Sequence, residues 1–250
     1  MPEPSPTLTD VDIDTTLEGT TPVLKGLLGV PAGNGPWPAV VVVHEVFGID
    51  GEMRKQVAHL ASLGYLALMP DLYSNGGMRR CLVSTMRAMR SGTGRAFLDI
   101  ETARQFLVNR PDATGAVGVI GFCMGGGFAL MTASSSGFDA AASNYGMLPG
   151  NPDEALAGAC PVIGSYGLRD GALKGAVATL EQTLTRHRVI HDLKEYPSAG
   201  HAFMNEAAAG PVWFRPVARV MNMKPDPDAA ADAWARIDSF FREHLVPPTV

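Results

Sequence analysis

The stretch GAVGVIGFCMGGGFALMTA, residues 115–133, decides the fold that this sequence predicts. An apolar run leads into Gly121-Phe122-Cys123-Met124-Gly125, and a second apolar run follows. The first run is typical of a buried strand and the second of a helix. A cysteine between two glycines at this junction indicates a sharp strand-to-helix turn, because small residues let the backbone cross closely.

The G-x-C-x-G pattern around Cys123 has two interpretations. In the hydrolase form, G-x-S-x-G, the nucleophile stands on a strained turn above the sheet edge. The next amide, that of Met124, would lie at a helix start, where free N–H groups and the helix dipole stabilise a thiolate and an oxyanion. The alternative is a buried, inert cysteine in a glycine-rich turn. The pentapeptide alone favours neither interpretation.

A nucleophile of this kind needs a histidine and an acid, which in α/β-hydrolases follow in the order nucleophile, acid, histidine. Asp170 lies in GSYGLRDG and His201 in EYPSAGHAFMN, each after a predicted strand. Taken singly, Asp170 resembles a helix N-cap and His201 a surface histidine. Together with Cys123, they close three strands in the required order and predict a Cys-His-Asp triad.

The end of another predicted strand, VVVVHEVFGID at residues 40–50, precedes the first major helix. In hydrolases this loop supplies the second amide of the oxyanion hole. Glu45 is unusual there, since a carboxylate directly follows a buried run. It is either a charge at the helix N-terminus or a partner that holds or takes the proton of the cysteine thiol.

The composition excludes several classes of protein. The formal net charge of the 250 residues is −5 and no basic block occurs, so nucleic-acid binding is not expected. The N-terminal residues do not resemble a secretory signal, and the apolar run at 39–47 is too short to span a membrane. Three widely spaced cysteines, Cys81, Cys123 and Cys160, predict neither disulfides nor a zinc site. We expect a cytoplasmic protein.

Strand-like and helix-like segments alternate along the chain. A hairpin at 11–31 comes first, and strands are predicted at 39–45, 65–73, 116–123, 140–146, 161–167 and 189–197. Helices are predicted at 50–64, 94–111, 125–136, 173–187 and 228–245. This order predicts one α/β domain over residues 1–250, with a mostly parallel sheet of about seven or eight strands and helices on both faces. Residues 203–227, with Trp213, Phe214 and Arg215, are expected to form a long loop of little regular structure, in which those residues line a pocket or anchor the loop.

The motifs jointly resemble the dienelactone hydrolase family, also called carboxymethylenebutenolidases, over residues 15–246. The resemblance is carried by HEVFG at 44–48, PDLY at 70–73, GFCMGG at 121–126, YGLRD at 166–170 and GHAF at 200–203. It implies an α/β-hydrolase fold, an oxyanion hole made by the amides of Met124 and Val46, and no metal or organic cofactor. It also implies that Glu45 holds the resting thiol and releases it when substrate enters. Phe47 is a further candidate for substrate contact.

One departure from the family pattern concerns the substrate. Members that act on dienelactone hold its carboxylate with arginines, one of them four positions after the catalytic histidine. Asn205 occupies that position here, and an amide cannot replace a guanidinium charge. Arg79 and Arg80 lie in the region that supplies the other arginine. The sequence therefore predicts the family's chemistry better than its substrate.

We predict an enzyme that hydrolyses a small-molecule ester or lactone through a cysteine acyl-enzyme, as a monomer or homodimer. Two alternatives stay open. One is a general carboxylesterase or thioesterase with a substrate other than dienelactone, which Asn205 favours. The other is a non-hydrolytic thiol protein, a redox sensor or binder, because a thiolate also oxidises readily.

Overall fold

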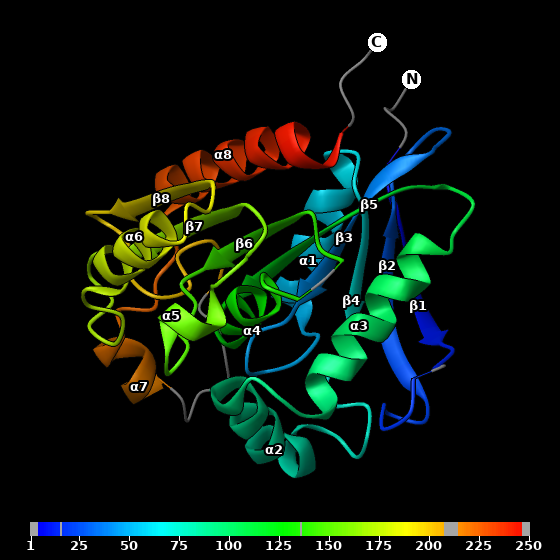
Figure 1. The fold of residues 1–250 in the computed structure, drawn as a ribbon, viewed down its shortest axis with the longest axis horizontal. Coiled ribbons are helices and arrows are strands. Elements are labelled where there is room, and N and C mark those ends of the chain that lie inside the picture. The colour runs from blue at the N-terminus through cyan, green and yellow to red at the C-terminus, as the bar shows by residue number, and fades with distance from the viewer. Residues whose placement is uncertain (1–4, 16, 136, 208–214, 247–250) are drawn as a thin grey trace.

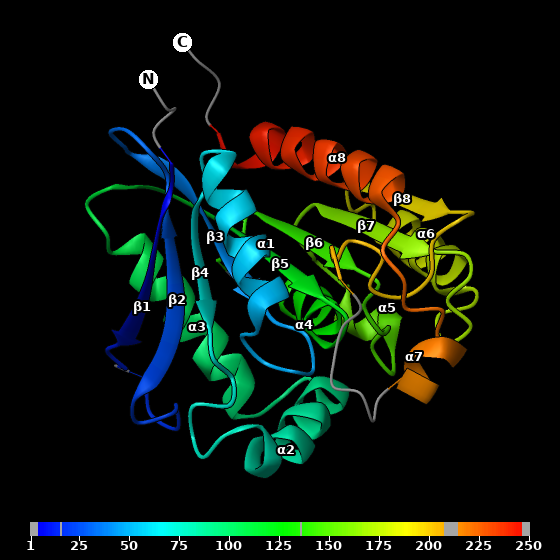
Figure 2. The ribbon, with the colours of Figure 1, turned by 180° about the vertical axis from the view of Figure 1, so that it is seen from behind.

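A twisted sheet of eight strands forms the centre of the molecule, in the order β1-β2-β4-β3-β5-β6-β7-β8. The computed structural model describes residues 5–15, 17–135, 137–207 and 215–246. The strands are β1 (Thr7–Ile13), β2 (Leu24–Val30), β3 (Trp37–Val43), β4 (Leu66–Pro70), β5 (Ala113–Phe122), β6 (Ala140–Asn144), β7 (Val162–Gly167) and β8 (His191–Tyr196). The β1–β2 and β2–β4 pairs are antiparallel, and all later pairs are parallel (Figures 1 and 2).

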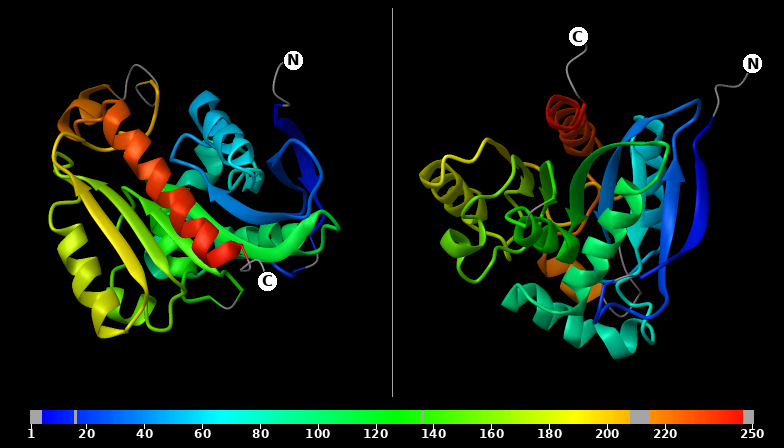
Figure 3. Two further views of the ribbon diagram at one scale, coloured as in Figure 1. Left: turned by 90° about the horizontal axis from the view of Figure 1, so that it is seen from above. Right: turned by 45° about the vertical axis from the view of Figure 1, so that its right-hand side comes forward.

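Helices cover both faces of this sheet. They are α1 (Gly51–Ser62), α2 (Met78–Ser91), α3 (Arg95–Val108), α4 (Met124–Thr132), α5 (Pro152–Ala155), α6 (Ala176–Arg186), α7 (Arg215–Val220) and α8 (Pro227–Leu245). Helices α1 and α8 pack on one face, and α3, α4 and α6 on the other (Figure 3). Helix α2 packs against α3 and α4. No described helix is both long enough and apolar enough to cross a membrane.

The sequence explains why the centre of the sheet is parallel and buried. Val40, Val41, Val42 and Val43 of β3 are fully buried, and alternate members belong to the cores on opposite faces. β-branched residues suit a strand that is covered on both sides, and such strands need helical crossovers. Helix α1 begins where the Asp50 carboxylate accepts the Met53 amide at 3.0 Å.

The predicted α/β-hydrolase class, the hairpin and the strand order along the chain are confirmed by the structure. Helix α2 was not predicted, although its buried residues, Cys81, Thr85, Ala88 and Met89, follow a helical spacing. The helix also contains four arginines, Arg79, Arg80, Arg87 and Arg90, which weaken that apolar signal. The expectation of a loop at 203–227 needs correction, because α7 forms within it. Trp213 and Phe214 lie outside the described residues.

Candidate active site

Cys123 stands on a strained turn between β5 and α4. Its backbone has φ 55° and ψ −114°, a conformation that costs free energy for a residue with a side chain. The flanking glycines are required by space. A Cβ on Gly121 would lie 1.9 Å from the carbonyl oxygen of Gly125, and a Cβ on Gly125 would lie 2.0 Å from that of Val43. The turn therefore exposes the Cys123 side chain at the carboxyl edge of the sheet.

The loops after β7 and β8 bring Asp170 and His201 together. The Nδ1 atom of His201 lies 2.5 Å from Oδ2 of Asp170, and both side chains are buried. The other carboxylate oxygen of Asp170 accepts the amide of Ala172 at 3.0 Å. A histidine held in this way has Nδ1 protonated and one orientation, so that its second nitrogen, Nε2, is the atom left for chemistry.

His201 interacts electrostatically with Cys123. Burial lowers the pKa of His201, but its interactions with Cys123 and Asp170 outweigh burial and raise the pKa to about 10. Nε2 is buried and has no partner with hydrogen-bond geometry among the described residues. Catalytic contacts are often loose before substrate binds. The raised pKa favours a protonated His201 ring next to Cys123.

Glu45 is fully buried next to this pair. Both of its carboxylate oxygens accept from Nδ2 of Asn205 at 3.3 Å, and one also accepts from the Tyr145 hydroxyl at 3.4 Å. Burial raises the pKa of Glu45 to about 7, although His201, Asn205 and Tyr145 oppose the shift. The structure therefore places Asn205 against Glu45, and no hydrogen bond joins Glu45 to Cys123 within the described chain.

The two predicted oxyanion amides lie on facing segments. Met124 is the first residue of α4, so its amide has no preceding helical turn to bond. Val46 lies in the loop after β3, and its amide donates to no acceptor in the described chain. Phe47 follows Val46 in the same loop and is half-buried. One side chain contacts both segments: the Tyr73 hydroxyl lies 2.9 Å from the Val46 carbonyl and 3.8 Å from the Met124 sulfur.

The two candidate arginines, Arg79 and Arg80, make no contact with the triad residues among the interactions described above. Arg79 and Arg80 lie exposed in the first turn of α2, and neither makes an ion pair within the described residues. The structure also reveals Tyr145, for which the sequence predicted no role, and which packs in a tilted arrangement against the His201 ring with centroids 5.2 Å apart. Its backbone φ of 42° marks a strained position after β6, but a sequence does not show strain.

No described cluster of three or more histidine, cysteine or acidic residues could hold a metal ion. The chemistry available to the site is that of a thiol, an imidazole, two carboxylates and main-chain amides. A strained nucleophile turn after a parallel strand, followed along the chain by an acid and a histidine at the same sheet edge, defines an α/β-hydrolase.

Comparison with known proteins identifies the family. The model of the dienelactone hydrolase family matches residues 24–245, so the chain belongs to that family. A Synechocystis protein, provisionally named carboxymethylenebutenolidase, is 29% identical over 94% of this chain and 99% of its own length. The carboxymethylenebutenolidase of Pseudomonas putida is 32% identical over 48% of this chain and 55% of its own length.

Solved structures show the same fold. A metagenomic dienelactone hydrolase-like promiscuous phosphotriesterase, P91, aligns with a TM-score of 0.78 and 23% identity, covering 96% of this chain and 99% of its own. The dienelactone hydrolase of Anabaena variabilis aligns with a TM-score of 0.70 and 21% identity, with the same coverage of both chains. At these identities the likeness concerns architecture.

Proposed function

We propose that this protein hydrolyses a carboxylic ester or lactone through a covalent acyl-enzyme on Cys123. The observation that carries the proposal is the buried His201 ring: Asp170 holds its Nδ1 at 2.5 Å, its Nε2 has no hydrogen-bond partner among the described residues, and Cys123 raises its pKa. A histidine held by a carboxylate and matched to a thiol is the arrangement that nucleophilic acyl transfer needs. If Cys123 were only structural, the buried Asp170–His201 pair would have no chemical role.

The first half-reaction forms the acyl-enzyme. The Cys123 thiolate attacks the carbonyl carbon, and the Met124 and Val46 amides stabilise the oxyanion. When this intermediate collapses, the C–O bond to the leaving group breaks and His201 gives its Nε2 proton to the departing oxygen. With a lactone, the released hydroxyl stays attached to the acyl group.

The second half-reaction frees the enzyme. His201, now neutral, takes a proton from water as the water attacks the thioester. The C–S bond breaks, the carboxylic acid leaves, and the thiolate–imidazolium pair is restored. Asp170 keeps the His201 ring in one orientation and stabilises its charge throughout. Thiolate is a good leaving group from this intermediate, so the step needs no further catalyst.

Glu45 is proposed to control the resting thiol. Its pKa of about 7 lets the carboxyl exchange a proton near neutral pH. To contact the thiol, the carboxyl would leave the Asn205 amide and the Tyr145 hydroxyl that now hold it. Asn205 thus governs how easily Glu45 moves.

The same contact favours a neutral substrate over an anionic one. Asn205 is 2% exposed and directs its amide at Glu45, so its position supplies no positive charge for a substrate carboxylate. We propose a neutral ester or lactone. Hydrolysis of a neutral and an anionic lactone should be compared as salt is raised. A selective, salt-sensitive preference for the anion would contradict this choice, because it indicates an arginine clamp.

The test of the reaction itself is stopped-flow hydrolysis of a chromogenic acetate ester. Wild type should release a burst of chromophore of about one equivalent, followed by a slower steady state set by deacylation. Cys123→Ala should abolish the burst, with its fold checked by circular dichroism. Full turnover in folded Cys123→Ala would overturn the proposal.

We further propose that the protein works in the cytoplasm. Its three cysteines are all free, and free thiols are typical of proteins in a reducing compartment. The oligomeric state, monomer or homodimer, stays a prediction that light scattering can measure.

A further inference from the structure

The loop that carries Val46 is held on both sides of that residue. The peptide group before Val46 contains the Glu45 carbonyl and the Val46 N–H. The next peptide group contains the Val46 carbonyl. The Glu45 carbonyl accepts from Nδ1 of His44 at 2.7 Å and from the Gly48 amide at 3.1 Å. The Val46 carbonyl accepts from the Tyr73 hydroxyl at 2.9 Å.

Because a peptide group is planar, these hydrogen bonds also set the direction of the Val46 N–H. In a trans peptide the C=O and the N–H point opposite ways, so a bond that fixes the Glu45 carbonyl also fixes the direction of the Val46 N–H. The bond from Tyr73 fixes the following plane, which leaves little rotation about the Val46 Cα. Tyr73 also touches the Met124 side chain, and it therefore spans both segments of the proposed oxyanion hole.

The protonation states of both side chains suit this role. Nε2 of His44 accepts the Leu72 amide at 3.1 Å, so the proton of the neutral ring must lie on Nδ1, facing Glu45. Burial lowers the pKa of His44 and keeps the ring neutral, although Asp71 opposes the shift. Burial also raises the pKa of Tyr73, which therefore remains a donor.

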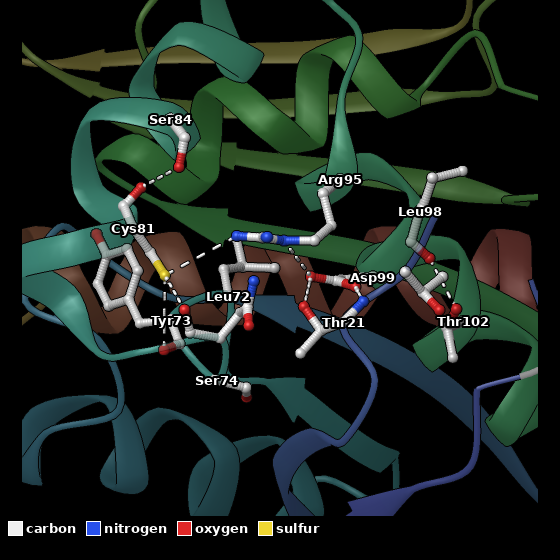
Figure 4. Close-up of polar contacts among 12 residues, drawn as sticks. Thr21, Leu72, Tyr73, Ser74, Cys81, Ser84, Arg95, Leu98, Asp99 and Thr102 are labelled. Carbon is white, nitrogen blue, oxygen red and sulfur yellow. Dashed lines mark hydrogen bonds and ion pairs between the residues drawn. The ribbon is translucent and has the colours of Figure 1, made fainter. Parts of the chain in front are cut away.

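The loop that carries Tyr73 is fixed from α2 and α3. Figure 4 shows the Cys81 sulfur between the Tyr73 carbonyl and the Arg95 guanidinium. The sulfur lies 3.8 Å from the carbonyl oxygen and 3.9 Å from a guanidinium nitrogen. Arg95 also pairs with the fully buried Asp99 at 4.0 Å, and Asp99 accepts the amide and the hydroxyl of Thr21 at 2.8 and 2.7 Å. Together with the Gly77 amide, which donates to the Tyr73 carbonyl at 2.7 Å, these contacts link the Tyr73 loop to α2 and α3.

We propose that His44 and Tyr73 are positioning residues that aim the Val46 amide at the developing oxyanion. The inference rests on the proposed function, in which that amide stabilises the tetrahedral intermediate. The HEVFG and PDLY segments then share one role, because each supplies a side chain that holds one peptide plane of the hole. Neither side chain is required to touch the substrate.

The test compares two reactions of the same thiol. One is burst-phase acylation of Cys123 by a chromogenic acetate ester, which passes through an oxyanion. The other is reaction of Cys123 with dipyridyl disulfide, in which a sulfur atom is attacked and no oxyanion forms. The sites of modification are read by peptide mapping. A variant that only misplaces the oxyanion donor should slow the first reaction and spare the second.

The variants are Tyr73→Phe, which removes one hydroxyl, and His44→Gln, which removes the donor at the Nδ1 position. Each should slow acylation about 10- to 100-fold, while the disulfide reaction stays within about twofold of wild type. His44→Asn places an amide donor near the Nδ1 position and should recover most of the rate lost in His44→Gln. The matched control is Tyr65→Phe, because Tyr65 is also buried and its hydroxyl bonds Asp238 of α8.

The outcomes separate this inference from the function on which it rests. A wild type with no Cys123 acylation would overturn the proposed function and this inference together. A normal wild-type burst with unchanged acylation in Tyr73→Phe and His44→Gln would overturn this inference alone. Equal slowing of both reactions, or equal slowing in Tyr65→Phe, would also overturn it, because the effect would then be general disorder.

Discussion

Two cysteines lie at helix starts, and they differ in almost everything else. Cys123 precedes α4 on a strained turn and is partly exposed, whereas Cys81 lies in the first turn of α2 and is 1% exposed. Both have a cationic side chain nearby, His201 for the first and Arg95 for the second.

A nearby positive charge therefore does not by itself make a cysteine a nucleophile. The Cys81 thiol donates to the Asn75 carbonyl at 3.2 Å and approaches the Tyr73 carbonyl, so its proton is already used in holding a loop. Cys123 has instead a strained backbone that leaves it partly exposed, and we propose that the Met124 and Val46 amides receive an oxyanion beside it while His201 carries protons. Access and preorganised donors separate a reactive thiol from a structural one.

The largest expected effect comes from replacing His201, the proposed proton carrier beside Cys123. His201→Gln should lower turnover of an acetate ester by about 1,000- to 10,000-fold, because the leaving group and the attacking water lose their proton partner. Asp170→Asn should approach this loss by allowing the wrong histidine tautomer. Steady-state kinetics on folded variants measures both. A loss below about tenfold in His201→Gln would contradict the triad.

The second prediction compares the thiols directly. Limited treatment of the native protein with dipyridyl disulfide should label Cys123 at least about 100-fold faster than Cys81, since burial blocks access. Cys160 should also react slowly, because burial and Asp139 raise the pKa of its thiol to about 12. Peptide mapping at several times gives the three rates. Comparable rates for Cys81 and Cys123 in folded protein would remove the distinction drawn above.

The third prediction concerns the carboxylate near Cys123. Burial raises the pKa of Glu45 from 4.5 to about 7, so the folded protein holds this proton more tightly than the unfolded chain does. Its contribution to stability is full below pH 4.5 and falls as the pH rises to 7, by on the order of 3 kcal/mol. The side chain of Glu45→Gln cannot ionise, so the variant should not lose this unfolding free energy. As the pH rises from 4.5 to 7, the unfolding free energy of the variant should therefore increase relative to that of wild type.

Urea unfolding of both proteins at pH 5 and pH 8 checks this prediction. Titrating groups that do not interact with Glu45 act equally in both proteins, so the difference reports Glu45 together with its electrostatic neighbour His201. If the difference in unfolding free energy between variant and wild type were the same at both pH values, Glu45 would have its ordinary pKa in the folded protein.

The smallest effect is expected at Cys81. Cys81→Ala should lower the unfolding free energy by about 1 kcal/mol and change turnover by less than about threefold. The Gly77 amide also donates to the Tyr73 carbonyl, at 2.7 Å. The loop therefore keeps this hydrogen bond when the contact from the Cys81 thiol is lost. Urea unfolding and ester kinetics measure the two quantities. A loss of turnover as large as that of Cys123→Ala would show that Cys81 takes part in the reaction.

The sequence predicts those parts of the fold and site that depend on local patterns. Cys123, Asp170 and His201 each follow a strand signal with a turn, and parallel strands bring their carboxyl ends to one edge. The contact between Asn205 and Glu45 joins residues 160 positions apart and depends on how two loops pack, which no local pattern encodes. The same is true of the bond from Tyr73 to Val46. Helix α2 was missed because its arginines mask the apolar spacing.

The most direct test of the proposed cysteine chemistry is to find the acyl group. Wild type is mixed with a chromogenic acetate ester, quenched with acid during the burst, digested, and analysed by mass spectrometry. We predict one acetyl group, on the peptide that contains Cys123, which disappears as the ester is exhausted. An acetyl group on another residue, or turnover without any adduct in a protein that shows a burst, would contradict a cysteine acyl-enzyme.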